Sequence, residues 1–144
     1  MTEDEKNSEI NEIDTLNAIC KGAKKEDKLS GKSLTALYDL FGQRFTKALE
    51  TLKENRVKKY VFKPSNRTVW IVVGRERDYL IIAEAEFCTC DDFYFRVLDK
   101  KVHMCYHILT QKIAANLGWL ELIQEKDECF DMLMNEWKNA SAQG

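Results

Sequence analysis

Residues 87–107 read FCTCDDFYFRVLDKKVHMCYH and hold three of the chain's five cysteines and both of its histidines. Cys88 and Cys90 are separated by one residue, Cys105 and His107 are also separated by one residue, and fourteen residues lie between the two pairs. Sulfur and imidazole side chains in two closely spaced pairs are typical ligands of a transition-metal site. This stretch therefore predicts a site that ties two segments of the fold together.

The residues before the first pair predict β-strands. Segments rich in Val, Ile and aromatic residues alternate with turn-like clusters that begin at Pro64 and Gly74, which predicts an antiparallel meander of three strands. Residues i and i+2 of an extended chain point to the same face, so the end of the third strand would present the sulfurs of Cys88 and Cys90 to one side. The predicted strands span residues 57–62, 68–73 and 79–87.

The residues around the second pair predict a helix that runs to Leu117. Apolar residues recur there at steps of three and four, and Gly118 is suited to end the helix. Within a helix, residues i and i+2 point about 200° apart. Cys105 and His107 can therefore converge only if Cys105 lies just ahead of the helix and His107 lies in its first turn. The positive end of the helix dipole also favours a thiolate at that position.

These placements predict one tetrahedral Zn²⁺ held by Cys88, Cys90, Cys105 and His107, which joins the last strand of the meander to the following helix. Zinc accepts three thiolates and one imidazole, and four protein ligands leave no position for water, so the site should be structural. Zinc sites of this kind in small peptides contribute about 10–16 kcal/mol. His103 is an alternative to His107, but it follows two lysines in a predicted loop.

Two other interpretations of the cysteines stay open at this point. Cysteines are often small buried hydrophobic residues, which is the interpretation that we favour for Cys20 and Cys129. A C-x-C pair can also serve in redox chemistry, but neither Cys88 nor Cys90 opens a helix as in the C-x-x-C oxidoreductases. Two chelating pairs in one chain favour the metal site.

We expect an α+β fold in which a three-stranded antiparallel meander is flanked by helices. An amphipathic helix is predicted at 34–53, with Ser33 as its N-cap, and a further helical stripe at 119–137. Residues 1–32 are expected to form an acidic and polar N-terminal arm that is partly helical. Residues 33–140 are expected to form one zinc-binding domain, in which the zinc finger occupies about 79–117.

The charges are distributed unevenly, although the net charge is only −2. Residues 1–14 contain six acidic and one basic residue, residues 121–144 six acidic and two basic, and residues 53–78 three acidic and eight basic. The basic segment predicts either a solvated sheet edge or a phosphate-facing surface with Tyr60 and Trp70 as stacking platforms. The candidate nucleic-acid-binding residues are Lys58, Lys59, Lys63, Arg67, Arg75 and Arg77.

The sequence lacks the patterns of several other classes of protein. It shows no apolar run of membrane-spanning length and no signal-peptide pattern, so we expect no membrane association and an intracellular location, cytoplasmic in an archaeon or nuclear in a eukaryote. It has no Walker A loop, so any ATPase activity would belong to a partner. It also lacks the H-x-E and P-C-x-x-C motifs of zinc deaminases, and we expect no enzymatic activity.

Four segments in this order resemble the SWIM zinc-finger family. They are LYDLFGQRFTKALETL at 37–52, YVFKPSNRTVWIVVG at 60–74, FCTCDDFYFRVL at 87–98 and MCYHILTQKIA at 104–114. The same segments look like those of the small single-domain SWIM proteins of the Shu recombination complex and their archaeal homologues. The resemblance implies a non-catalytic adaptor in homologous recombination and DNA repair, which binds a RecA/Rad51-family paralogue and supports recombinase assembly on single-stranded DNA. The alternative function is direct nucleic-acid binding by a zinc-finger protein through the basic segment 53–77.

Overall fold

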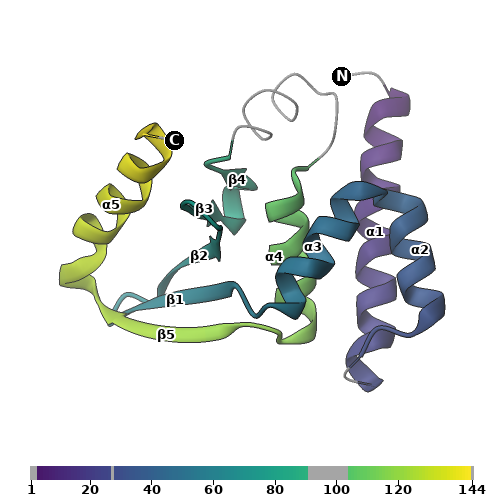
Figure 1. Ribbon diagram of the computed structural model, residues 1–144, viewed down its shortest axis with the longest axis horizontal. Coiled ribbons are helices and arrows are strands. Elements are labelled where there is room, and N and C mark those ends of the chain that lie inside the picture. Colours follow the sequence, from purple (N-terminus) through teal and green to yellow (C-terminus); the bar gives the residue numbers. More distant parts are fainter. Residues whose placement is uncertain (1–2, 27, 91–103, 144) are drawn as a thin grey trace.

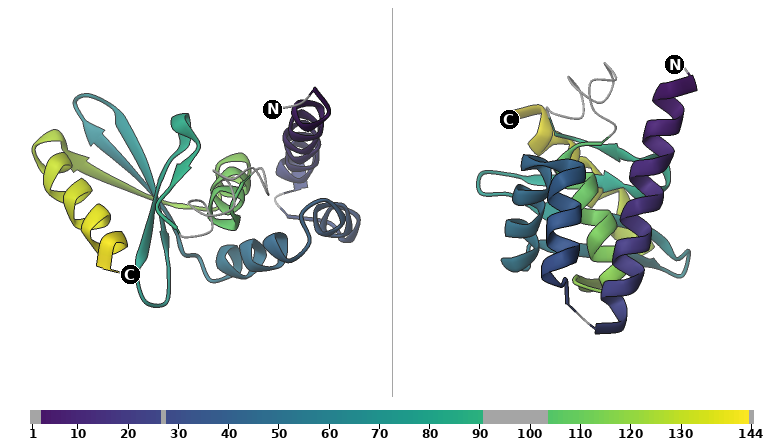
Figure 2. Two further views of the ribbon diagram at one scale, coloured as in Figure 1. Left: turned by 90° about the horizontal axis from the view of Figure 1, so that it is seen from above. Right: turned by 90° about the vertical axis from the view of Figure 1, so that its right-hand side faces the viewer.

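The computed structural model describes residues 3–26, 28–90 and 104–143 as an α+β fold. Helices α4 and α3 lie on one side of a sheet with α1 and α2 outside them, and α5 covers the other face (Figures 1 and 2). None of the helices in these ranges has both the length and the apolar character of a membrane span. The helices are α1 (Glu3–Glu26), α2 (Gly31–Phe41), α3 (Gln43–Lys53), α4 (Tyr106–Leu117) and α5 (Phe130–Gln143).

The sheet contains the predicted meander and extends it on both sides. The strands are β1 (Val57–Lys63), β2 (Arg67–Val73), β3 (Asp78–Ile82), β4 (Phe87–Cys88) and β5 (Glu121–Lys126). Their order is β4-β3-β2-β1-β5. The antiparallel pairing of β1 with β2 and of β2 with β3 confirms the meander. β4 adds an antiparallel strand next to β3, and β5 adds a parallel strand next to β1, so the sheet is mixed.

Strand β5 corrects the prediction of one helix over 119–137. Gly118 ends α4 in the left-handed region with φ 75°, and the chain then runs alongside β1 with Glu121 opposite Lys58. A short 3₁₀ helix (Asp127–Cys129) leads on to α5. The backbone hydrogen bonds offered by the free edge of β1 outweigh the helical pattern of the side chains, because backbone donors and acceptors must find partners.

The predicted helix 34–53 is two helices, α2 and α3, which are separated by Gly42. Gly42 adopts φ 62° and ψ −132°, a backbone conformation that only glycine adopts without strain. The N-cap of α2 is Ser30 rather than Ser33, because the Ser33 N–H donates to Ser30 Oγ at 3.2 Å. The break lets α3 lie against α4, while α2 lies on the outer side of α3.

The predicted third strand, 79–87, is also divided. β3 ends at Ile82, a short 3₁₀ helix follows, and Glu86 adopts φ 50°. The chain therefore reverses, and β4 pairs antiparallel with β3 so that Cys88 lies opposite Ile81. The first pair of cysteines consequently lies beside β3 instead of beyond its end.

The stretch that we expected to be an N-terminal arm contains α1, and part of α1 belongs to the core. Leu16, Cys20 and Ala23 are buried where α1 lies against α4 and α2. The apolar stripe of this helix thus finds its partner surface within the same chain. Burial raises the pKa of the Cys20 thiol to about 11, as expected for a cysteine that serves as a hydrophobic residue.

Two hydrophobic clusters lie on the two faces of the sheet. The larger one fills the space between the sheet and helices α1 to α4, and it includes Cys88, Cys90 and Cys105. The smaller one lies under α5, where the ring of Trp137 meets that of Tyr60 edge-on with centroids 4.9 Å apart. The buried residues of the smaller cluster are Phe62, Val69, Ile71, Leu80, Met134 and Trp137.

We expect Trp137→Ala to lower the free energy of unfolding by about 3–5 kcal/mol, because it removes a large buried ring from a small cluster. Met132 lies on the same helix but is 56% exposed, so Met132→Ala should change the free energy of unfolding by less than about 0.5 kcal/mol. Chemical denaturation of both variants measures the difference. Equal stabilities would show that α5 does not anchor this face of the sheet.

Candidate metal centre

The two pairs of ligand-type residues come together from two elements. Cys88 is the last residue of β4 and Cys90 follows two residues later, while Cys105 is the N-cap of α4 and His107 lies in its first turn. All four residues are buried. One donor atom from each lies within 4.8 Å of the donor atoms of the other three. The predicted placement of Cys105 ahead of the helix and of His107 inside it is confirmed.

Backbone pairing orients the first pair. Thr89 lies between the two cysteines, and its N–H donates to the Leu80 carbonyl at 3.1 Å while its Oγ1 accepts from the Leu80 N–H at 3.1 Å. These two bonds tie residue 89 to β3. Because neighbouring side chains of an extended segment point to opposite sides, Cys88 and Cys90 share the side away from Thr89.

Side chains from other elements hold the second pair in place. Arg44 of α3 donates from Nη1 to the carbonyl of Met104, the residue before Cys105, at 2.8 Å. Lys112 of α4 forms an ion pair with Glu86 in the turn before β4, with Nζ and Oε1 3.0 Å apart. The two halves of the centre are thus linked to each other and to α3 by contacts that do not involve the four donor atoms.

The imidazole of His107 is enclosed by two tyrosines. Its ring centroid lies 4.0 Å from that of Tyr79 and 3.9 Å from that of Tyr106. His107 is only 3% exposed, yet neither of its ring nitrogens has a hydrogen-bond partner among the described residues. A buried polar group without a partner costs about 1–3 kcal/mol. Coordination of a metal ion would give one of these nitrogens a partner.

The three thiols cannot all ionise in this space without a cation. Hydrogen bonds with Cys105 and Cys88 lower the pKa of Cys90, whereas those with Cys105 and Cys90 raise the pKa of Cys88. The hydrogen bond with Cys88 lowers the pKa of Cys105, but the hydrogen bond with Cys90 and burial outweigh it and raise that pKa to about 12. The shifts oppose one another because neighbouring thiolates repel, and a positive charge between the sulfurs would favour the thiolate form of all three.

The size of the centre fits one small transition-metal ion. Tetrahedral zinc with bonds of about 2.3 Å to sulfur and about 2.0–2.1 Å to nitrogen separates its ligand atoms by about 3.5–3.8 Å. The donor atoms lie within 4.8 Å of one another, so small side-chain movements would bring them to these separations. The four residues could therefore hold a metal ion. The alternative ligand His103 lies outside the described residues.

Comparison with known proteins places the chain in a family. No protein-family model and no solved structure matches it. The chain is 31% identical over 105 residues to a zinc finger SWIM domain-containing protein 7 homologue of Dictyostelium discoideum, and the match covers 72% of this chain and 67% of the relative. The chain belongs to the SWIM domain-containing protein 7 family.

Two further relatives extend the comparison to archaea and animals. An uncharacterized protein of Archaeoglobus fulgidus is 36% identical over 88 residues, which cover 61% of this chain and 68% of the relative. Human zinc finger SWIM domain-containing protein 7 is 25% identical over 126 residues, which cover 85% of this chain and 89% of the relative. The relatives named as zinc-finger proteins agree with the cluster of four buried Cys and His side chains.

The structure of this SWIM protein does not gather the six predicted nucleic-acid-binding residues on one surface. Lys58 and Lys59 are neighbours on β1 and point to opposite faces of the sheet. Lys63 and Arg67 lie at the turn between β1 and β2, whereas Arg75 and Arg77 belong to the turn between β2 and β3 at the other end of the strands. The six residues therefore form separate groups.

Most of these cations also contact other side chains. The Lys63 ammonium donates to the Asn66 side chain, and Nη2 of Arg67 lies 3.8 Å from Oδ1 of Asp127. Arg75 is paired with Glu50 at 3.4 Å, and Lys59 and Arg77 lie over the rings of Trp70 and Tyr79. The proposed stacking platforms are also engaged, since Trp70 is 5% exposed and Tyr60 packs against Trp137. The prediction of Trp70 as an accessible platform is wrong because its ring belongs to the larger core cluster.

Sequence reasoning missed the residues that surround His107. Tyr79 and Tyr106 line a polar hollow of about 400 Å³ next to the centre, together with Lys47, Arg56 and Arg75. Arg56 is fixed there by hydrogen bonds to the Val73 carbonyl at 3.1 Å and to Thr51 Oγ1 at 3.3 Å. Tyr106 precedes His107 in the sequence, so its contact with the imidazole could have been predicted. The contact of Tyr79 could not, because Tyr79 reaches the centre only through the pairing of β3 within the sheet.

We expect purified protein to contain one bound transition-metal ion per chain and Cys105→Ser to lose it, because a serine oxygen is a poor substitute for a thiolate ligand. Cys129 lies outside the cluster and is partly exposed, so Cys129→Ser is the matched control and should keep the ion. Elemental analysis of the three proteins gives the metal content. Full metal content in Cys105→Ser would remove Cys105 from the ligand set.

Proposed function

We propose that the protein is a non-catalytic adaptor whose fold is closed by one structural Zn²⁺. The observation that carries this proposal is the set of three buried sulfurs and one buried imidazole within 4.8 Å of one another. Cys88, Cys90, Cys105 and His107 would hold the ion, and no aspartate or glutamate of the described residues joins the cluster. A zinc ion with four protein ligands supplies cross-linking energy and no open position for a substrate.

The role of the ion in this proposal is to fix a surface. It would connect β4, which lies at one edge of the sheet, to the start of α4, which lies under α1 and α3. Cross-linking energy of about 10–16 kcal/mol is as large as the whole stability of a typical domain. The arrangement of the helices over the sheet would therefore depend on the ion.

The proposed partner is a RecA/Rad51-family paralogue, with which the protein would support recombinase assembly on single-stranded DNA in homologous recombination and repair. The resemblance of four sequence segments to the SWIM proteins of the Shu complex supports this partner. The separation of the six cations into different groups favours contact with DNA through the partner over direct binding. None of the five cysteines, all of which lie in the described ranges, forms a disulfide, which suits a reducing intracellular compartment, nuclear in a eukaryote or cytoplasmic in an archaeon.

Affinity capture from a native lysate of the source cells tests the proposal. Wild-type protein and the control Cys129→Ser should each retain an ATPase of the RecA family, identified by mass spectrometry. Cys105→Ser should lose it, because loss of the ion releases the start of α4 from the sheet.

Two results would contradict the proposal. One is a wild-type capture that contains no RecA-family ATPase. The other is retention of that ATPase by a Cys105→Ser protein that elemental analysis shows to be free of metal, because the docking surface would then not depend on the ion.

A further inference from the structure

Strand β5 has an open edge. It is the terminal strand on its side of the sheet and pairs with β1 along Glu121–Lys126. Within the described ranges, no other strand pairs with its outer edge, which runs along the bottom of the molecule in Figure 1. An edge of six residues presents a row of backbone N–H and C=O groups to which another extended chain can add.

The two sides of β5 differ in chemical character. Glu121, Ile123 and Glu125 alternate with the others and lie on the side of the sheet covered by α5, where Ile123 is opposite Tyr60. Burial and the negative charge of Asp78 raise the pKa of Tyr60, and the charges of Glu125 and Glu121 add to this effect. The two glutamates of β5 therefore act on the neighbouring strand. Lys58 lies opposite Glu121 on the same side, so the two carboxylates outnumber the cation there by one, and this side of the edge would attract basic residues.

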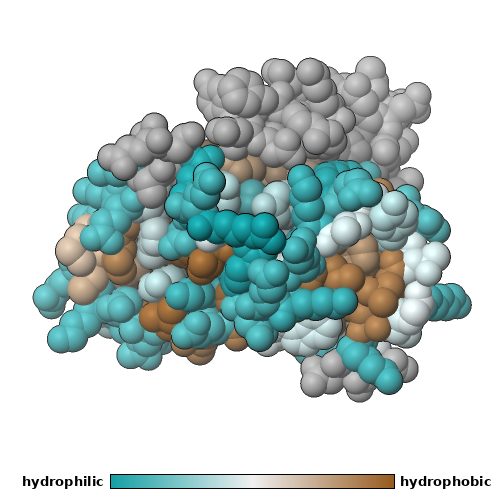
Figure 3. Space-filling view, in the orientation of Figure 1, coloured by the Kyte–Doolittle hydropathy of each residue, from teal (hydrophilic) through white to brown (hydrophobic). Residues whose placement is uncertain are grey.

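The other side of β5 carries Leu122, Gln124 and Lys126 and lies toward the helical layer, so Leu122 is its one apolar residue. Leu122 is opposite Lys59 and is 65% exposed, more than the other exposed large hydrophobic residues of the described chain. Figure 3 shows hydrophobic residues at the surface in the region where β5 runs, separated by hydrophilic ones. An exposed leucine on an open edge is a feature that monomeric sheet proteins usually avoid.

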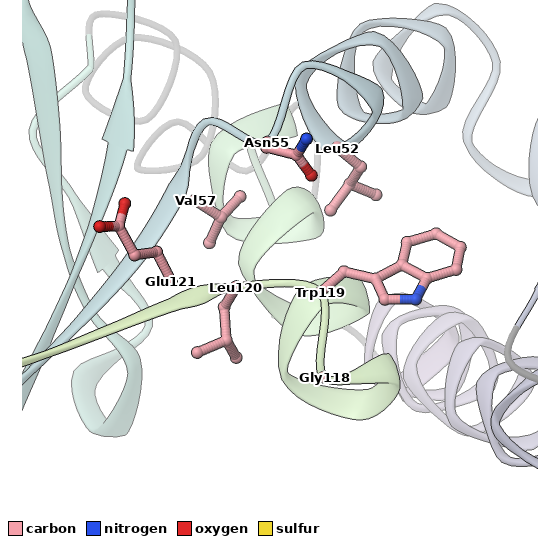
Figure 4. Close-up of a pocket in the computed structure, with 7 residues that line it drawn as sticks. All are labelled: Leu52, Asn55, Val57, Gly118, Trp119, Leu120 and Glu121. Atoms are coloured by element: carbon pink, nitrogen blue, oxygen red, sulfur yellow. The ribbon is translucent and has the colours of Figure 1, made fainter.

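A pocket continues this side at the start of β5. It has a volume of about 590 Å³ and lies where the end of α3, the start of β1 and the connection from α4 to β5 meet (Figure 4). Its lining is mostly apolar and comprises Leu52, Val57, Trp119 and Leu120 with Asn55, Gly118 and Glu121. The pocket is large enough for one or two apolar side chains of a bound segment.

We propose that β5 and this pocket form the docking site for an extended segment of the partner protein, which adds to the sheet as a further strand. The segment carries basic residues four positions apart opposite Glu121 and Glu125, and apolar residues on its other side that follow Leu122 into the pocket. This inference rests on the proposed adaptor function and names its contact surface. Backbone pairing supplies affinity, and the alternation of basic and apolar residues supplies specificity.

Charge complementarity argues against a second copy of the chain as the occupant. A two-fold antiparallel pairing of two β5 strands centred on Ile123 places Glu121 of one copy opposite Glu125 of the other. A pairing centred on Gln124 places Glu121 opposite Asp127. Like charges directly opposite each other destabilise strand pairs. A pairing centred on Leu122 avoids such contacts but pairs only residues 121–123 of β5 with one another, whereas a basic segment can pair along the whole strand.

The test uses the zinc-loaded protein and the RecA-family paralogue that is captured with it. Hydrogen exchange of the β5 amides, followed by mass spectrometry, should slow in the complex over residues 121–126. Leu122→Asp should weaken binding of the paralogue by about tenfold or more, because it replaces the exposed leucine beside the pocket with a charge. The matched control is Met132→Asp, which changes another exposed hydrophobic residue on α5 and should bind like the wild type.

The outcomes separate the two proposals. Equal binding by Leu122→Asp and unchanged exchange over 121–126, with the paralogue still bound, would overturn the docking site and leave the adaptor function standing. Absence of binding by the wild-type protein would overturn both. Concentration-dependent dimers of the isolated protein that Leu122→Asp abolishes would identify a second copy as the occupant and would also overturn the docking site.

Discussion

Three sulfurs and one imidazole are enclosed in a space of less than 5 Å, and the rest of the fold depends on what balances their charge. Without a cation, hydrogen bonds among the sulfurs lower the pKa of Cys90 and raise that of Cys88, and the histidine nitrogens have no hydrogen-bond partner in the described part of the protein. With a divalent cation at the centre, the same atoms become a closed set of ligands. The centre is therefore a strong cross-link when loaded and an unfavourable cluster when empty.

The position of this cross-link explains how one ion could organise the whole chain. β4 leads back through β3 and β2 to β1, while α4 leads forward through Gly118 to β5, which returns to the other side of β1. Helices α1 and α3 both lie against α4. Loss of the link at Cys105 would thus free the central helix, on which two outer helices and the path to β5 depend.

Features that depend on local sequence could be predicted, and those that depend on distant pairing could not. The spacing of Cys105 and His107 and the helical period after them were enough to place both residues at the start of α4. The parallel strand β5 could not be found, because its stability comes from β1, more than fifty residues earlier in the chain. The division of the helix at Gly42 depends on a single φ of 62°, which the continuous apolar stripe conceals.

X-ray absorption at the zinc edge of freshly purified protein tests the central claim most directly. The account predicts three sulfur atoms at about 2.3 Å and one imidazole nitrogen at about 2.0–2.1 Å around the ion, supplied by the three clustered cysteines and His107. A spectrum dominated by oxygen and nitrogen neighbours, or one that includes a bound water, would contradict a closed structural site.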